Sequence, residues 1–165
     1  MIRKAVLEDI KKVMEILNKT KSEMHLYNNF QWDESYPRRS DFINDIKKEN
    51  LYSIEVDGDL AGFVCLNNIE PIEYKQLNWS CKGTAMVIHR MSVNPKFRGI
   101  GIGTKLMKFA QEIANKNNIK YLKTDTYSLN IKMNNLLKKC GYNFIGYTSF
   151  PQKEKPFYCY DIILK

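Results

Sequence analysis

One segment near the middle of the chain, residues 93–104, alternates glycine with isoleucine between a predicted strand and a predicted helix. It reads Val-Asn-Pro-Lys-Phe-Arg-Gly-Ile-Gly-Ile-Gly-Thr. Glycine adopts backbone conformations that other residues avoid and lets the backbone approach a ligand closely. The first turn of a helix adds unpaired N–H groups and partial positive charge. The segment therefore predicts an anion cradle suited to a pyrophosphate, with Arg98 at its start and Lys105 and Lys108 further along the helix.

Two common phosphate loops do not fit this segment. A Walker A loop needs Gly-Lys-Ser/Thr at the start of the helix, whereas the chain has Gly103-Thr104-Lys105. The dinucleotide fingerprint G-x-G-x-x-G needs a glycine where Thr104 stands, and it belongs to the first strand–helix–strand unit of a parallel sheet. Here the loop follows the fourth predicted strand, so both classes are set aside.

The hydrophobic pattern over the rest of the chain predicts a single α/β domain over residues 1–165, with a mixed sheet and helices on both faces. The expected order is β-α-α-β-β-β-α-β-α-β-β. Expected strands cover 2–6, 51–56, 60–66, 86–93, 119–127, 142–150 and 157–164. Expected helices cover 7–26, 40–49 with Ser40 as N-cap, one from Gly101 onward, and 131–139. Residues 67–83 are expected to be irregular.

Composition narrows the class of partner. The formal net charge is +8, which favours anionic partners such as nucleic acid, a membrane surface or a phosphorylated cofactor. Only five of the 26 basic residues are Arg, the residue that base reading usually needs, and no apolar run reaches the ~18 residues of a membrane span. The four cysteines are scattered without a C-x-x-C pair, so we expect reduced thiols and no metal site. The expected location is the cytoplasm, with neither nucleic acid nor membrane as a partner.

The spacing that does fit the loop is R-x-x-G-x-G, carried by Arg98, Gly101 and Gly103. The string N-P-K-F-R-G-I-G-I-G-T-K-L-M resembles the acetyl-CoA loop of the GCN5-related N-acetyltransferases (GNAT), N-P-x-[YF]-R-G-x-G-I-G-x-x-L-[ML]. Asn130 together with Gly141-Tyr142 is similar to a second motif of that family. The predicted order of elements matches the family over nearly the whole chain.

This resemblance implies an acetyl-CoA-dependent N-acetyltransferase that passes an acetyl group directly from the thioester to a primary amine. It implies a pantetheine arm that pairs with the free edge of the strand before the loop, and a diphosphate held by the loop. The implied cofactor-binding residues are Met91, Ser92, Val93, Arg98, Gly99, Ile100, Gly101, Ile102, Gly103, Thr104 and Asn130. A backbone amide near Met91 is the candidate donor to the developing oxyanion.

Two positions depart from the family pattern. Many members carry a Glu where this chain has Val87, and a Tyr where it has Leu137, so neither role carries over. Strict alternation places His89 on the same face as Met91 and Val93, and an unperturbed pKa near 6.5 suits proton relay, so His89 is the candidate base. Its rival interpretation is a packed histidine with a satisfied ring. The candidate acid is Tyr127, or water. Arg90 is expected to pair with a carboxylate such as Asp125, which with Thr126 would support the site.

The acceptor is expected to contact Trp32, Asp33, Glu34 and Tyr36, because aromatic and acidic side chains suit a cationic amine. The rival interpretation is an aromatic lid packed on the sheet. A non-catalytic CoA- or nucleotide-binding regulatory module and a nucleic-acid-binding protein are the alternative functions. The expected assembly is a monomer or a homodimer, and the identity of the amine is left open.

Overall fold

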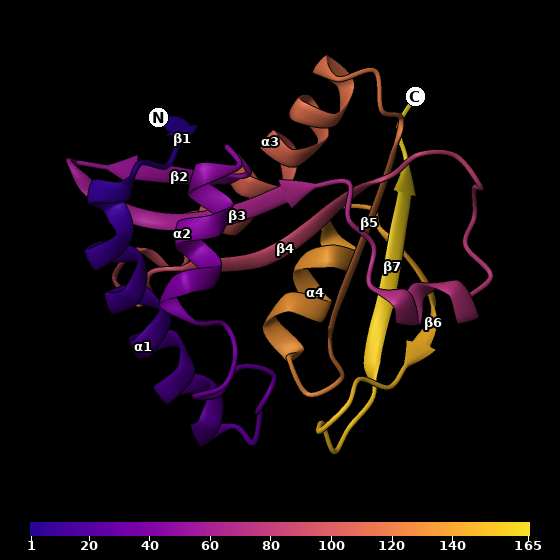
Figure 1. Cartoon of the computed structure of the whole chain (residues 1–165), viewed down its shortest axis with the longest axis horizontal. Coiled ribbons are helices and arrows are strands. Elements are labelled where there is room, and N and C mark those ends of the chain that lie inside the picture. The colour runs from indigo at the N-terminus through magenta and orange to yellow at the C-terminus, as the bar shows by residue number, and fades with distance from the viewer.

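Seven strands form one sheet in the order β1-β2-β3-β4-β5-β7-β6, with helices on both faces, in a computed structural model that describes residues 1–165 (Figure 1). All neighbouring strands are antiparallel except β4 and β5. The strands are β1 Ile2–Lys4, β2 Leu51–Val56, β3 Asp59–Asn67, β4 Met86–Val93, β5 Tyr121–Tyr127, β6 Asn143–Thr148 and β7 Phe157–Ile163. The helices are α1 Ile10–Leu26, α2 Arg39–Lys47, α3 Ile102–Lys116 and α4 Ile131–Lys139. The predicted mixed α/β class is confirmed.

Several element boundaries differ from the expectation by a few residues. Ser40 is not the N-cap of α2, which begins at Arg39, and Asp41 Oδ2 instead accepts the Arg38 N–H at 2.6 Å. β5 begins at Tyr121, two residues later than expected. The Ile119 N–H donates to the Ala114 carbonyl oxygen, so Ile119 is still bonded to the end of α3. The segment expected to be irregular holds a 3-10 helix, η2, over Ile72–Gln76.

Two apolar clusters sit on opposite faces of the sheet. On one face α1 and α2 pack against β2 and β3, with Leu17, Phe42 and Phe63 fully buried. On the other face α3 buries Leu106 and Ala110 at the i, i+4 spacing of a helix stripe. In Figure 1, α1 and α2 lie in front of β2–β4 while α3 and α4 lie behind the sheet. No helix is both long and apolar enough to span a bilayer.

The sheet opens between its two parallel strands. β4 and β5 pair only over Met86–Leu122, Val87–Lys123 and Ile88–Thr124. Beyond these pairs β4 turns away while β5 continues alongside β7, so the two strands diverge (Figure 1). The edge of β4 from His89 onward therefore has no strand partner on the β5 side, and its backbone groups are available for hydrogen bonding.

A β-bulge in β4 accompanies this opening. β4 takes three steps from His89 to Ser92 while its partner β3 takes two steps from Cys65 to Phe63. The extra residue of β4 lies at Arg90, which has a φ of 41°. A bulge adds one residue to one strand, so it changes which face the following side chains occupy.

The bulge overturns one expectation about the side chains of β4. Met86 and Ile88 belong to the α3 cluster before the bulge, and Met91 and Val93 pack on the same cluster after it. His89 therefore lies on the opposite face from Met91 and Val93, together with Val87. The expected shared face was wrong because strict alternation assumes a regular strand.

Candidate functional site

A cavity of about 1580 Å³ opens where β4 and β5 diverge. Its walls come from α1, the α1–α2 loop, the second half of β4, the loop into α3, the C-terminal part of β5, the start of α4 and the β6–β7 loop. Pockets that hold a drug-sized ligand usually measure about 300–1,000 Å³. This cavity is larger, so it has room for an elongated cofactor and a second reactant.

The loop into α3 presents a run of free backbone donors. No backbone N–H from Gly99 to Thr104 has a hydrogen-bond acceptor in the protein, and the ladder of α3 begins with Lys105 N–H on Gly101 O. Gly101 is the N-cap of α3 with a φ of 82°, a conformation that side chains other than glycine rarely adopt. The predicted loop residues Arg98, Gly99, Gly101, Ile102, Gly103 and Thr104 all line the cavity, whereas Ile100 is exposed outside it. This arrangement can hold an anion.

Two cations at the cavity wall share one carboxylate. Arg98 from the loop and Lys132 from α4 both form ion pairs with Glu23 of α1. The hydrogen bond from Arg98, followed by that from Lys132, holds the pKa of Glu23 below its usual range despite burial, which acts in the opposite direction. Sequence reasoning missed Glu23 because it is 75 residues from Arg98 in the chain.

Asn130 lies across the cavity from β4, at the start of α4. Its Oδ1 accepts the Met133 N–H at 3.2 Å, which caps the helix. Its Nδ2 donates to Oε1 of Gln31 at 3.2 Å, and the same oxygen accepts from Thr126 Oγ1. Gln31 thus ties the α1–α2 loop to this wall, and no sequence motif indicated that role.

The predicted β4 residues have different surroundings. Met91, Ser92 and Val93 all line the cavity. The Ser92 side chain is buried and shares a 2.9 Å hydrogen bond with Thr20 of α1. The Ser92 hydroxyl is therefore already hydrogen-bonded to α1.

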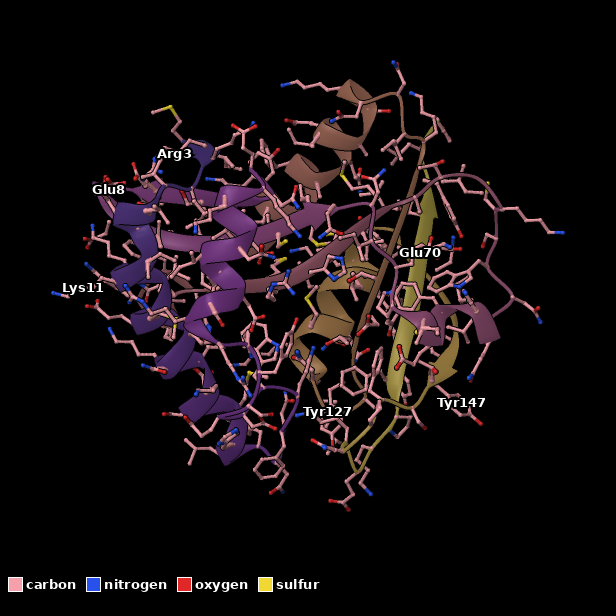
Figure 2. All side chains as sticks on the ribbon, in the orientation of Figure 1. Arg3, Glu8, Lys11, Glu70, Tyr127 and Tyr147 are labelled. Atoms are coloured by element: carbon pink, nitrogen blue, oxygen red, sulfur yellow. The ribbon has the colours of Figure 1, made fainter.

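The two predicted catalytic residues are not brought together. His89 lines the cavity, its Nε2 lies 2.9 Å from Asn67 Oδ1, and burial followed by the nearby charge of Arg90 lowers its pKa to about 4. Tyr127 is buried toward the end of β5 (Figure 2), and its hydroxyl accepts the Lys155 N–H at 3.2 Å. Tyr127 does not line the cavity.

The expected acceptor residues divide into two groups. Trp32, Asp33 and Tyr36 line the cavity, whereas Glu34 lies outside it and pairs with Lys21. Trp32 is also buried in the apolar cluster that α1 and α2 form.

Lys153 joins the α1–α2 and β6–β7 loops across this part of the cavity. Its Nζ donates to Asp33 Oδ2 at 2.8 Å and to Phe30 O at 2.7 Å. Burial is the largest single effect on the pKa of Asp33, and it raises that pKa. The hydrogen bonds from Lys153 and Ser35 together outweigh burial and hold the pKa well below its usual range.

Arg90 pairs with Asp45 of α2 rather than with Asp125. Its Nε and Nη2 donate to the two Asp45 carboxylate oxygens at 2.7 Å each, and its Nη1 donates to the Tyr36 hydroxyl at 2.7 Å. The expected partner was wrong because the bulge residue is directed toward α2. The side chain that pairs with Asp125 is Tyr74 of η2, whose hydroxyl donates to Oδ2 at 2.5 Å.

Comparison with known proteins gives one consistent assignment. Residues 10–142 match the family described as "Acetyltransferase (GNAT) family". The uncharacterized N-acetyltransferase YesJ of Bacillus subtilis is 23% identical over 146 residues, covering 86% of this chain and 81% of YesJ.

Solved structures agree with that match in fold. A GNAT-family acetyltransferase of Streptococcus agalactiae superposes with a TM-score of 0.85 at 23% identity, covering 100% of this chain and 95% of that one. The yncA protein of Salmonella typhimurium, solved with its cofactor acetyl-CoA, has a TM-score of 0.74 at 14% identity, covering 100% and 94%.

Proposed function

Because this chain belongs to the acetyltransferase (GNAT) family, we propose that it transfers an acetyl group from acetyl-CoA to the nitrogen of a primary amine. The acetyl group leaves a thioester and forms an amide, by direct attack of the amine on the thioester carbonyl. The observation that carries this proposal is the run of free N–H groups from Gly99 to Thr104 at the wall of a cavity beside an open strand edge.

The donors of the loop fit the diphosphate of coenzyme A. Six consecutive N–H groups without acceptors, at the N-terminus of a 15-residue helix, favour an anion through both hydrogen bonding and the helix dipole. Arg98 adds formal positive charge at the same wall. In this proposal the residues from Arg98 to Thr104 hold the diphosphate, and Ile100 contributes its backbone rather than its exposed side chain.

The open edge of β4 fits the amide-bearing pantetheine arm. An extended group with amides can add to an unpaired strand edge by backbone hydrogen bonds. Met91, Ser92 and Val93 would supply that edge, and Asn130 would contact the arm from the opposite wall. The Met91 N–H is the proposed donor to the oxyanion that forms on the thioester carbonyl, because a fixed donor stabilises developing charge.

The amine must lose protons during transfer. A primary amine with a pKa near 10.4 is only about one part in a thousand neutral at pH 7. The roles predicted for His89 and Tyr127 stay predictions. The low pKa of His89 and the absence of Tyr127 from the cavity lining favour neither as the group that contacts the amine.

The cradle is tested by Gly101→Asp with Gly58→Asp as a matched control. Both glycines have positive φ, and a Cβ added at either meets nothing within 4 Å. Gly58 lies in the β2–β3 turn and does not line the cavity. By calorimetry, the control should bind coenzyme A as the wild type does, whereas Gly101→Asp should lose binding by like charge. Retained micromolar binding in Gly101→Asp would count against the cradle.

The transfer itself is tested by thiol release. Wild-type protein with acetyl-CoA should release free thiol faster when a suitable primary amine from a mixed panel is added. Binding of NAD or ATP in place of coenzyme A would overturn the proposal.

A further inference from the structure

The cavity lining contains one charged side chain that has no partner of opposite charge. The lining carboxylates are Glu23, Asp33 and Asp125. Glu23 pairs with Arg98 and Lys132, and Asp33 pairs with Lys153. The remaining lining cation, Arg90, pairs with Asp45. Asp125 alone is left without a counter-ion.

The hydrogen bonding of Asp125 leaves one carboxylate oxygen free. Oδ2 accepts from the Tyr74 hydroxyl, and Oδ1 has no hydrogen-bond partner in the protein. The nearest cation on the same strand is Lys123, which forms an ion pair with Glu70, with its Nζ 2.8 Å from Oε1. A partly buried carboxylate with a free oxygen is costly unless a ligand completes its hydrogen bonds.

Asp125 lies at the point where the sheet opens. Its neighbour Thr124 makes the last pair with β4, through Ile88. Asp125 is the first residue of β5 beyond that pair, and it lines the same cavity as the second half of β4. The acetyl group of a pantetheine arm laid along the open edge of β4 would end near this point.

We propose that Asp125, held by Tyr74, binds the ammonium group of the acceptor and takes its first proton, so that the acceptor class is a cationic primary amine. This rests on the proposed function. The R-NH₃⁺ group gives one proton to the carboxylate, and the nitrogen lone pair then forms the C–N bond. The nitrogen gives up a second proton as the C–S bond breaks. The thiolate takes up one of these two protons and the other passes to solvent.

Several groups set the protonation of Asp125. Burial raises its pKa to about 6, the Tyr74 hydrogen bond opposes this, and Glu73 adds to the rise. The titratable and charged side chains around it are Tyr74 and Glu73 from η2, Cys159 from β7, His89 and Arg90 from β4, Lys123 from β5 itself, and Tyr36 from the α1–α2 loop. At pH 7.5 the carboxyl group is ionised, and at pH 5 it is mostly neutral.

The test needs no knowledge of the natural acceptor. S-(2-aminoethyl)-coenzyme A carries an ammonium next to the sulfur, and S-propyl-coenzyme A is its neutral counterpart of the same length. At pH 7.5 the wild type should bind the aminoethyl compound about tenfold more tightly by calorimetry, the size expected of one hydrogen bond to a charged group. The preference should disappear at pH 5 and in Asp125→Asn.

Two further variants keep the result interpretable. Asp59→Asn removes an exposed carboxylate outside the cavity and should keep the preference. Tyr74→Phe removes a bond that stabilises the ionised form, so the midpoint at which the preference disappears should move to higher pH. This shift tests the pair even if Asp125→Asn does not fold.

The outcomes separate this inference from the proposed function. Equal binding of the two analogues by the wild type, or a preference that survives in Asp125→Asn, overturns the inference while coenzyme A binding stands. If neither the analogues nor coenzyme A bind, the proposed function fails and the inference fails with it.

Discussion

At the scale of single residues, the surroundings of a side chain determine its pKa and hence its protonation state. His89 and Asp125 both line the cavity, and both have perturbed pKa values with burial as the largest cause. Burial disfavours the charged form of each group, so it lowers the pKa of the histidine and raises that of the carboxyl. His89 is therefore neutral at pH 7, while Asp125 titrates near neutral pH.

His89 should make the protein less stable in acid. Its pKa is about 4 in the folded chain and 6.5 ordinarily, so below pH 6.5 the unfolded chain binds a proton that the folded chain does not. Stability attributable to His89 should fall between pH 6.5 and pH 4, by up to about 3 kcal/mol, and stay level below that range. Urea unfolding of wild type and His89→Gln at pH 7.5, 5.5 and 4.5 measures the difference, and parallel curves for the two proteins would contradict it.

The sequence predicts the cradle residues but not the Asp125–Tyr74 pair, for a physical reason. Glycine spacing between a strand and a helix is a local signal, and Arg98 and the glycines lie within a few residues of one another. Tyr74 and Asp125 are 51 residues apart, and only the packing of η2 against β5 and β7 brings them together. The partner of Arg90 was mispredicted for the same kind of reason.

At the scale of elements, the order of strands and helices was predictable and the bulge was not. Apolar periodicity and the glycine and asparagine signals give the bounds of β2 and α4 correctly. Nothing in Met86–Val93 indicates an extra residue at Arg90, because the bulge is stabilised from outside the strand. Asp45 of α2 and the Tyr36 hydroxyl both bind the Arg90 guanidinium.

Arg90→Ala should therefore destabilise the protein strongly. The Arg90 and Asp45 side chains are 14% and 5% exposed, and removing the cation leaves a buried carboxylate without a partner. The expected loss is about 3–5 kcal/mol in the free energy of unfolding, measured with urea. Lys96→Ala breaks the exposed pair with Asp59 and should cost less than about 1 kcal/mol. Equal losses in the two variants would contradict the expected stabilisation by the buried Arg90–Asp45 pair.

At the scale of the whole molecule, the charge of +8 does not itself make the binding site. Two of the cations at the cavity wall, Arg98 and Lys132, are already paired with Glu23. In the proposed binding mode, an incoming phosphate would compete with that carboxylate for these two cations. The affinity for coenzyme A therefore depends on how Glu23 is arranged as well as on the number of basic residues.

Glu23→Gln should bind coenzyme A severalfold more tightly than the wild type, with a steeper loss of affinity as salt is added, because two cations become free to contact phosphate. Glu15→Gln is the matched control, since it removes one negative charge from an exposed position on the same helix, outside the cavity. Calorimetric titrations at two salt concentrations compare the variants. An identical gain in the control would assign the effect to net charge alone.

Only three residue pairs join strands β1–β4 to strands β5–β7 through the sheet. By contrast, β2 and β3 pair over six residue pairs and β5 and β7 over seven. In the proposed binding mode, a pantetheine arm that binds the edge of β4 on one side and Asn130 on the other would link the two parts of the molecule. In the proposed reaction the two parts would be linked in this way only while the cosubstrate is bound, so the stiffness of the protein would change with each cycle.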